Sequence, residues 1–428
     1  MNTHVHLLLC GVLVASCGGH VVTPTTTPTT TPTTTPPPAK PAGIAGYVAH
    51  LKANGHRPSD YIIDLFRSHD VVILGERMHP ELTQWELIYD LVTDPRFVDQ
   101  VGTIYTEYGA VNLQDRLDRY LDDPHAEREQ LLGILRDFGN WSIGWSNPNF
   151  IEFLDRLRRF NTSQPAGHRV RLRFADCYWD WRALDEHNFA AFSRETMFAR
   201  DFLMAKRIAT GIEAEQPRDR KKALVIMNSR HSYVIDPRNT HGALDDNTGS
   251  YLRGLLPDRG VVSVLLNTTA QAAGSTDRDG GAATLIAGGK WDAAFRALGD
   301  QPIGFDLAGS PFGDDAFDLH QRYRDLHFRD VYHGVVFVNP LASQTKQEVA
   351  PGYMTGEFVR EARRRLRYAS VGRSPAEIAE NRQRIEQFLA LFALPVLPAP
   401  IAAELYKSRP VYRPAELARF EEQIATWR

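Results

Sequence analysis

Hydrophobic residues fall into two alternating kinds of segment along this chain. From residue 43 onward, short β-branched runs recur, several of them apolar at nearly every position, as in strands buried on both faces. The predicted strands span residues 71–74, 102–106, 170–174, 223–227, 261–266, 303–305 and 335–338. Between the strands, apolar residues recur every three or four positions, which is the spacing of one helix face.

Three of these helical stripes are well defined. They comprise Leu82, Trp85, Ile88, Tyr89 and Val92; then Leu113, Leu117, Tyr120 and Leu121; then Phe150, Phe153, Leu154 and Leu157. Strands that alternate with helices favour parallel pairing, because each helix carries the chain back to the same edge of the sheet. The pattern therefore predicts an α/β fold with a mostly parallel central sheet flanked by helices.

The pattern changes after about Leu341, where it becomes largely helical. Ser374-Pro375-Ala376-Glu377 is a capping box with proline at the first helical position, and it predicts the start of a helix. We expect a helical extension over residues 345–428. Because no internal repeat or shift in composition divides the chain, residues 44–428 are expected to form one α/β domain that includes this extension.

The first residues have the pattern of an exported lipoprotein. A short apolar run ends in Ala15-Ser16-Cys17, which resembles the site where bacteria attach lipid to a cysteine and cleave before it. Residues 1–17 are thus expected to be a signal peptide. The Thr/Pro-rich residues 18–43 are expected to be a disordered tether, because they contain almost nothing to bury. This predicts a protein held in the cell envelope outside the cytoplasm, on the periplasmic or outer surface, with the membrane as a partner through lipidated Cys17.

Charge and cysteine content narrow the classes of function. The formal net charge is −3, and acidic and basic residues are mixed along the chain. The sequence therefore shows no basic cluster of the kind that binds nucleic acid. Cys10 lies in the predicted signal and Cys17 is the predicted lipid site, which leaves Cys177 in the folded part. No internal disulfide can then form, and stability must come from the core.

Polar residues follow four successive predicted strands. They are Glu76, Arg77 and His79; Glu107; Asp176; and Arg230 and His231. Ligands of open α/β sheets bind beyond the carboxyl ends of the strands, so these side chains are expected to converge on one crevice. A histidine held by a carboxylate activates water near neutral pH, and the same groups can bind a divalent metal.

In order along the chain, these residues resemble the erythromycin esterase-like family, within a superfamily that includes the haem-uptake ChaN and Tiki proteins. The resemblance covers about residues 68–268. It starts at Gly75-Glu76-x-x-His79 and continues through Trp141 and Trp145, the strand ending in Asp176, and the helix Arg200-Asp201-Phe202-Leu203-Met204-Ala205, to His231.

The resemblance implies a hydrolase acting on a small-molecule ester, lactone or amide. It makes His79 the general base, supported by Glu76 and Glu107, with His231 and Arg200 binding the polar part of the substrate. Arg77, Asp176 and Arg230 are expected among the substrate-binding residues. Trp145, with Trp141, Trp179 and Trp181, is expected to form an apolar wall.

Two alternatives stay open from the sequence. One is a surface lipoprotein that binds haem or another hydrophobic ligand without catalysis. The other is a Tiki-like metal-dependent peptidase, for which His79, Glu107 and His231 resemble ligands. We rank metal-free chemistry above it, because no closely spaced pair of histidines is present. The sequence predicts no cofactor firmly; a divalent metal and haem remain candidates.

Overall fold

The computed structural model describes residues 43–139, 142–214, 221–240, 247–271, 283–369, 374–393 and 397–427. Cys17, the predicted tether up to residue 42 and Trp141 lie outside these residues. All seven predicted strands are present: β1 (Val71–Glu76), β2 (Thr103–Ala110), β3 (Arg171–Asp176), β4 (Ala223–Asn228), β5 (Val261–Leu266), β8 (Ile303–Asp306) and β9 (Gly334–Phe337).

These strands form one seven-stranded sheet in the order β3-β2-β4-β1-β5-β9-β8. Every pair is parallel except β8 with β9, which is antiparallel at the edge. The predicted α/β fold with a mostly parallel sheet is therefore confirmed. Because the strands from β3 to β9 share one direction, their carboxyl ends lie along the same edge of the sheet.

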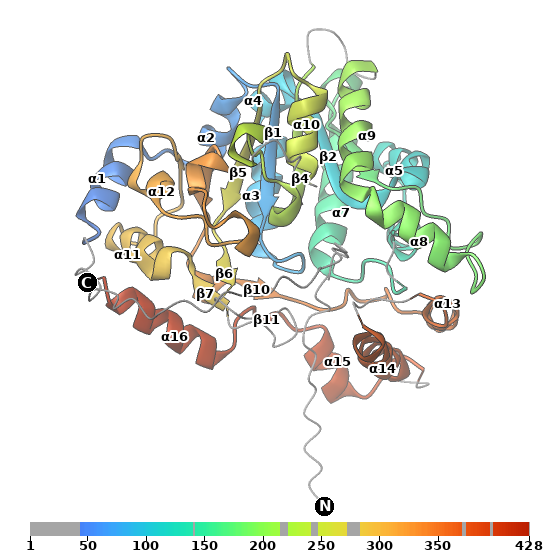
Figure 1. Cartoon of the computed structure of the whole chain (residues 1–428). Coiled ribbons are helices and arrows are strands. Elements are labelled where there is room, and N and C mark those ends of the chain that lie inside the picture. Colours follow the sequence, from blue (N-terminus) through green and yellow to red (C-terminus); the bar gives the residue numbers. More distant parts are fainter. Residues whose placement is uncertain are drawn as a thin grey trace, which may run out of the picture.

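Helices cover both faces of the sheet (Figure 1). One face packs against α2 (Pro58–Leu65), α3 (Thr83–Thr93), α4 (Pro95–Gln100), α5 (Gln114–Asp122), α6 (Arg128–Arg136) and α7 (Pro148–Ser163). The other face packs against α9 (Arg200–Ala214) and α10 (Thr248–Leu255), and at the β9 end against α1 (Ala45–Asn54), α11 (Lys290–Ala297) and α12 (Pro311–Asp314). The three predicted helical stripes coincide with α3, α5 and α7.

Residues along each central strand alternate between the two cores. Val72 and Leu74 of β1 point into the core under α2 to α7, whereas Val71 and Ile73 point into the core under α9 and α10. All four are fully buried. This explains why β1 is apolar from Val71 to Leu74, because neither face of this strand meets water.

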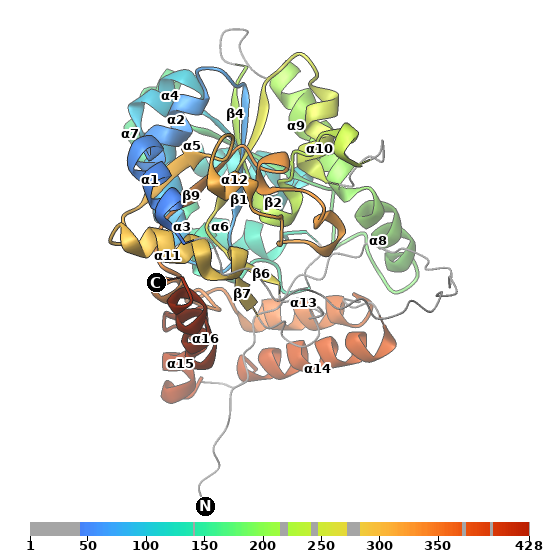
Figure 2. The same ribbon diagram turned by 60° about the vertical axis from the view of Figure 1, so that its left-hand side comes forward.

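The C-terminal extension is helical as expected. It contains α13 (Gly356–Leu366), α14 (Pro375–Leu391), α15 (Ala399–Leu405) and α16 (Pro414–Ala425), and Figure 2 shows α13 and α14 side by side below the sheet. The Ser374 hydroxyl accepts a hydrogen bond from the Glu377 amide, so the predicted cap of α14 is present. The structure adds two small antiparallel pairs: β6 (Thr269–Gln271) with β7 (Ala283–Leu285), and β10 (Thr345–Lys346) with β11 (Arg409–Pro410).

The extension contacts the carboxyl edge of the sheet. The Leu82 amide, just after β1, donates to the Thr345 carbonyl at 2.8 Å, and Glu81 forms a β-bridge with Lys346. The remaining described segments include the short helices α8 (Phe189–Phe198) and η4 (Ser229–His231). No helix among the described residues is long and apolar enough to cross a membrane. Cys177 is buried as a free thiol.

Candidate functional site at the carboxyl edge of the sheet

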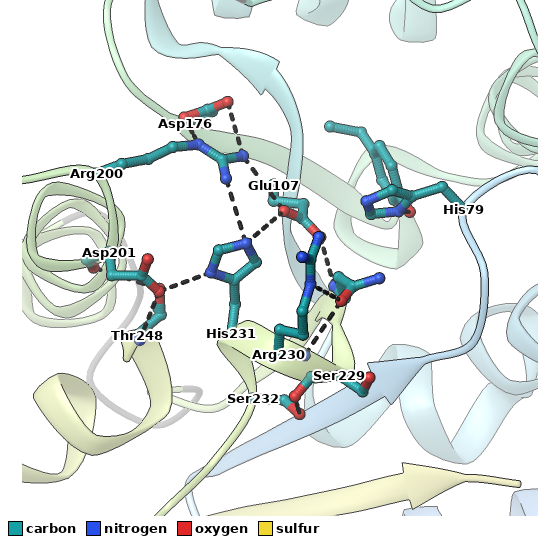
Figure 3. A network of polar contacts seen from close by, with 12 residues as sticks. His79, Glu107, Asp176, Arg200, Asp201, Ser229, Arg230, His231, Ser232 and Thr248 are labelled. Atoms are coloured by element: carbon teal, nitrogen blue, oxygen red, sulfur yellow. Dashed lines mark hydrogen bonds and ion pairs between the residues drawn. The ribbon is translucent and has the colours of Figure 1, made fainter. Parts of the chain in front are cut away.

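Polar side chains from four strand ends meet at the carboxyl edge (Figure 3). Glu76 ends β1, Glu107 lies in β2, Asp176 ends β3, and His231 lies in η4 directly after β4. All four residues are buried. The structure thus brings together side chains that lie far apart in the sequence, at the edge where the sequence placed them.

A β-bulge in β2 sets the position of Glu107. The register of β2 against β3 shifts between Thr106 and Ala110, so the residues between them leave the regular ladder. Gly109 has a φ of 135°, and a Cβ there would lie 2.1 Å from the ring of Phe174. Only glycine fits this backbone. Bulges commonly re-aim side chains beside active sites.

Glu76, His79 and Tyr108 form a compact group. Nδ1 of His79 contacts Oε1 of Glu76 and the Tyr108 hydroxyl, and that hydroxyl also donates to Oε1 of Glu76. Glu76 has no exposed side-chain surface, while 13% of the His79 side chain is exposed. Nδ1 is therefore committed to the protein interior.

The other ring nitrogen of His79 faces a different environment. Among the described residues, Nε2 of His79 has no hydrogen-bond partner. Protein atoms do not enclose this nitrogen completely. Burial lowers the pKa of His79, but the carboxylates of Glu76 and Glu107 outweigh burial and raise it above its usual value. His79 thus combines an anchored nitrogen with one that keeps contact with solvent.

Glu107 lies between the two histidines. One of its oxygens accepts from the Asn228 amide; the other lies 3.2 Å from Nη2 of Arg200 and 3.6 Å from Nε2 of His231. Burial would raise its pKa, but the positive charges of His231, His79 and Arg200 lower it to about 2. Glu107 is therefore an ionised carboxylate at neutral pH.

Arg200 is held mainly by Asp176. Its Nε donates to Oδ1 of Asp176 at 2.9 Å, and its Nη2 reaches Oδ2 at 3.1 Å. A third nitrogen, Nη1, lies 3.3 Å from Nε2 of His231. Such paired contacts fix a guanidinium strongly. Asp176, which the sequence placed among the substrate contacts, therefore orients Arg200.

The loop that carries His79 is fixed by neighbours from α7 and the segment before it. Asn149 donates to the carbonyl of His79, and its side-chain oxygen accepts from the Trp145 indole at 3.4 Å. The Trp145 ring meets the His79 ring edge to face, with centroids 5.5 Å apart. Trp145 is 6% exposed and belongs to the hydrophobic core; its role in an apolar wall for a substrate stays a prediction.

Trp179 and Trp181 are placed differently from the expectation. Both are only 2% exposed and belong to the hydrophobic core, where they pack against each other and against Phe189 of α8. They do not form the expected wall, because the β3–α8 connection folds them inward.

The two remaining predicted arginines differ from each other. Arg77 is 1% exposed and forms an ion pair with Glu81 at 2.9 Å; it also donates to Asn339 and Thr83. This is a correction: Arg77 is an internal structural residue with no surface to offer a substrate. Arg230 is half-buried, and Figure 3 shows it between His231 and His79. Its Nε donates to Asn228 at 3.2 Å.

Sequence reasoning missed two residues of this cluster. Tyr108 received no role although it directly follows Glu107, and Asp201 received none although it directly follows Arg200. Tyr108 contacts both Glu76 and His79, and Asp201 contacts His231. The glycine after Tyr108 was the available signal, since Gly109 makes the bulge that turns this segment. For Asp201, no comparable signal is present.

One subset of the cluster has the donors and spacing of a metal site. Ligand atoms of Glu76, His79 and Glu107 all lie within 4.8 Å of one another. Among the described residues, Oε2 of Glu76 is buried without a hydrogen-bond partner. Burying a carboxylate oxygen without a partner is costly, so this atom is suited to a bound cation or to a polar group of a ligand.

Comparison with known proteins yields weak likenesses. No protein-family model matches the chain, and no curated protein matches it. A solved Bacillus cereus protein is 11% identical over 69% of this chain and 97% of its own, with a TM-score of 0.41. A succinoglycan biosynthesis protein is 12% identical over 68% of this chain and 96% of its own, with a TM-score of 0.36. The type III effector HopBA1 is 13% identical over 51% and 86%, with a TM-score of 0.29. At these scores the likenesses carry no argument about function.

Proposed function

We propose that this protein is a hydrolase that uses His79 to activate water for attack on an ester, a lactone or an amide. One observation carries the proposal. Nδ1 of His79 is held by the buried carboxylate of Glu76, whereas Nε2 has no partner among the described residues and keeps contact with solvent. An imidazole anchored in this way presents a lone pair to an incoming water.

The proton balance follows from this arrangement. Nδ1–H donates to Glu76, and Nε2 takes a proton from the attacking water. The imidazolium that forms is stabilised by Glu76, with Glu107 close by, and these two carboxylates already raise the pKa of His79. A base is most effective when its pKa lies near the working pH. Negative charge on the attacked carbonyl oxygen would be balanced by the guanidinium of Arg230.

The proposal extends to the family and location expected from the sequence. The resemblance to erythromycin esterase-like proteins assigns the same base to Gly75-Glu76-x-x-His79, and the geometry of the pair is consistent with that role. We also retain the expectation of a lipid-anchored protein outside the cytoplasm. Its substrates would then be small molecules that reach the cell envelope.

Hydrolysis by a His79→Gln variant tests the proposal. The purified chain is assayed with a panel of 4-nitrophenyl esters and with a macrolide lactone, and the best substrate is used for comparison. We expect kcat/KM to fall by about 100-fold to 10,000-fold, because general base catalysis contributes that much. Because the substitution also replaces the Nδ1 contacts with the buried Glu76 and with Tyr108, the melting temperature is measured in parallel and rates are compared on folded protein.

A matched control keeps the result specific. His168 lies at the surface in an ion pair with Asp99, and its side chain is 55% exposed. A His168→Gln variant should therefore hydrolyse the same substrate at the wild-type rate. Equal loss in both variants, or full activity of His79→Gln, would contradict the proposal.

A second candidate is a metal-dependent hydrolase, and the buried Oε2 of Glu76 favours it. Glu76, His79 and Glu107 together offer one imidazole and two carboxylates, a set that suits Zn²⁺ and other divalent first-row cations. These three residues would hold the ion, which would lower the pKa of a bound water. The residues present fit such an ion.

Removing and restoring the metal ion distinguishes a metal-dependent reaction from metal-free hydrolysis. The protein is treated with a chelator, dialysed, and titrated calorimetrically with Zn²⁺ and with Mn²⁺. The metal candidate predicts one binding site, which is lost in Glu107→Gln, and an activity that returns only with the cation. Activity that survives chelation unchanged excludes this candidate and leaves the metal-free reaction.

A further inference from the structure

His231 belongs to a second imidazole–carboxylate pair. Its Nδ1 lies 2.8 Å from Oδ1 of Asp201, the second residue of α9. Only 7% of the His231 side chain and 20% of the Asp201 side chain are exposed. Its Nε2 faces the opposite direction, toward Arg200 and Glu107 at 3.3 and 3.6 Å (Figure 3).

Asp201 is itself held from a third element. Its Oδ1 accepts from the amide of Thr248 at 2.9 Å and from the Thr248 hydroxyl at 2.7 Å. Thr248 is the first residue of α10, where backbone amides lack partners inside the helix. Burial would raise the pKa of Asp201, but His231 and Thr248 outweigh it and hold the pKa below its usual value.

An ionised carboxylate accepts hydrogen bonds and donates none. The atom that faces Asp201 must therefore carry a proton, which places hydrogen on Nδ1 of His231. Nε2 is then an unprotonated nitrogen that faces the interior of the site, where it can accept a hydrogen bond from Nη1 of Arg200. The hydrogen-bond partner of one ring nitrogen thus determines whether the other nitrogen donates or accepts a hydrogen bond.

We infer that Asp201 is a positioning residue that holds His231 with its Nδ1 protonated, with Thr248 fixing Asp201 in turn. The site then contains two imidazole–carboxylate pairs, Glu76 with His79 and Asp201 with His231, one on each side of Glu107. This inference rests on the proposed hydrolase and deepens it: the proton that His79 takes from water can pass on to the leaving group, while His231, with Nε2 unprotonated, keeps Arg200 in place beside Glu107.

The tautomer of His231 is measured directly by nuclear magnetic resonance. The full chain is labelled with ¹⁵N-histidine, two-bond ¹H–¹⁵N spectra are recorded at one neutral pH, and the His231 signals are identified from a His231→Gln variant. Protonated Nδ1 in the wild type supports the inference. An Nε2–H tautomer with bare Nδ1 overturns it, whether or not any substrate has been found.

Two variants of Asp201 extend the test. Asp201→Ala removes the acceptor, and we expect the His231 signals to move to values averaged between the two tautomers. Asp201→Leu keeps most of the volume and likewise offers no acceptor to Nδ1, so it serves if the alanine variant fails to fold. A His231 tautomer unchanged in the folded variants overturns the positioning role.

A surface pair supplies the matched control. Asp99→Asn alters the exposed pair with His168, whose Nδ1 lies 3.2 Å from Asp99, and should leave the His231 signals unmoved. With an ester substrate in hand, a folded Asp201→Ala or Asp201→Leu variant should lower kcat by about a hundredfold at an unchanged KM, as expected when an imidazole loses its orienting carboxylate. If His79→Gln is fully active while the His231 tautomer is as inferred, the proposed base fails and the positioning role stands.

Discussion

At the scale of single residues, the ion pair between Arg77 and Glu81 is the most deeply buried one close to the site. The two side chains are 1% and 0% exposed, and the charged atoms lie 2.9 Å apart. Arg77 also donates to Asn339, beyond the end of β9. The pair therefore joins the loop that carries His79 to the chain that enters the C-terminal extension.

Breaking this pair from one side should be costly. An Arg77→Met variant leaves the Glu81 carboxylate buried without its cation, and we expect the free energy of unfolding in urea to fall by about 3 kcal/mol. The double variant Arg77→Met/Glu81→Gln should recover part of the loss, since no uncompensated charge remains. A single variant as stable as the wild type would show that the pair is not a structural link.

Asp292 gives a prediction about pH. Burial, together with Asp300 and Glu421, raises the pKa of this carboxyl from 3.8 to about 7 in the folded chain, against the opposing charge of Arg296. Between these two values the unfolded chain has lost the proton while the folded chain keeps it. Stability therefore falls as pH rises from 3.8 to about 7, and the loss is complete above that range.

Asp292→Asn removes this dependence. The variant should melt at a higher temperature than the wild type at pH 8, with the difference shrinking toward zero at pH 4. Thermal unfolding of the variant and the wild type at pH 4 and at pH 8 measures this difference in melting temperature. An equal difference at both values would mean that the asparagine acts by changing packing in the small cavity that Asp292 lines with Phe337 and Leu341.

At the scale of elements, the bulge in β2 controls where Glu107 points. Gly109 adopts a backbone that favours glycine, and the ring of Phe174 in β3 occupies the space that a side chain would need. The strand therefore leaves the regular ladder where the site begins. Local sequence explains the glycine, while the neighbouring strand explains why nothing larger fits.

Gly109→Ala should destabilise the fold and displace Glu107. We expect a loss of about 2 to 3 kcal/mol in the free energy of unfolding, from backbone strain and from the clash with Phe174. Gly109→Ala/Phe174→Ala should be less destabilised than the sum of the two single variants, because the second change removes the clash. Simple additivity would indicate that the two residues do not compete for this space.

At the scale of the whole molecule, the C-terminal extension holds several loops at the site edge. Thr345 accepts from the loop after β1, the Ala350 amide donates to Ser146 at 2.7 Å, and Arg364 of α13 donates to the Trp181 carbonyl at 2.7 Å. These loops come from three different crossovers of the sheet. The extension thus acts as a brace for the edge where the candidate site lies.

Export and lipid attachment form the prediction for the whole chain. In bacterial cells labelled with a radioactive fatty acid, the wild type should take up label and Cys17→Ser should not, because the thiol is the expected attachment point. Cys10→Ser is the matched control and should keep the label, since that residue lies within the expected signal. Labelling of Cys17→Ser would refute the lipoprotein prediction.

The sequence by itself determined which segments become strands and helices. All seven predicted strands and the three helical stripes are present, and so is the Ser374 cap. These features follow from the local period of apolar residues and from short-range capping, both of which are properties of neighbouring residues. The sequence also predicted that the polar residues after the strands lie near one another, because parallel strands end at the same edge of the sheet.

Only the tertiary structure decided which groups pair with one another. Arg77 turns into the interior and meets Glu81, Asp176 orients Arg200, and the tryptophans after β3 enter the core. Tyr108 and Asp201 join the site through contacts with partners more than twenty residues away in the chain. The direction of a side chain depends on strand order, on register and on the space left by packing, and these are set by residues distant in the sequence.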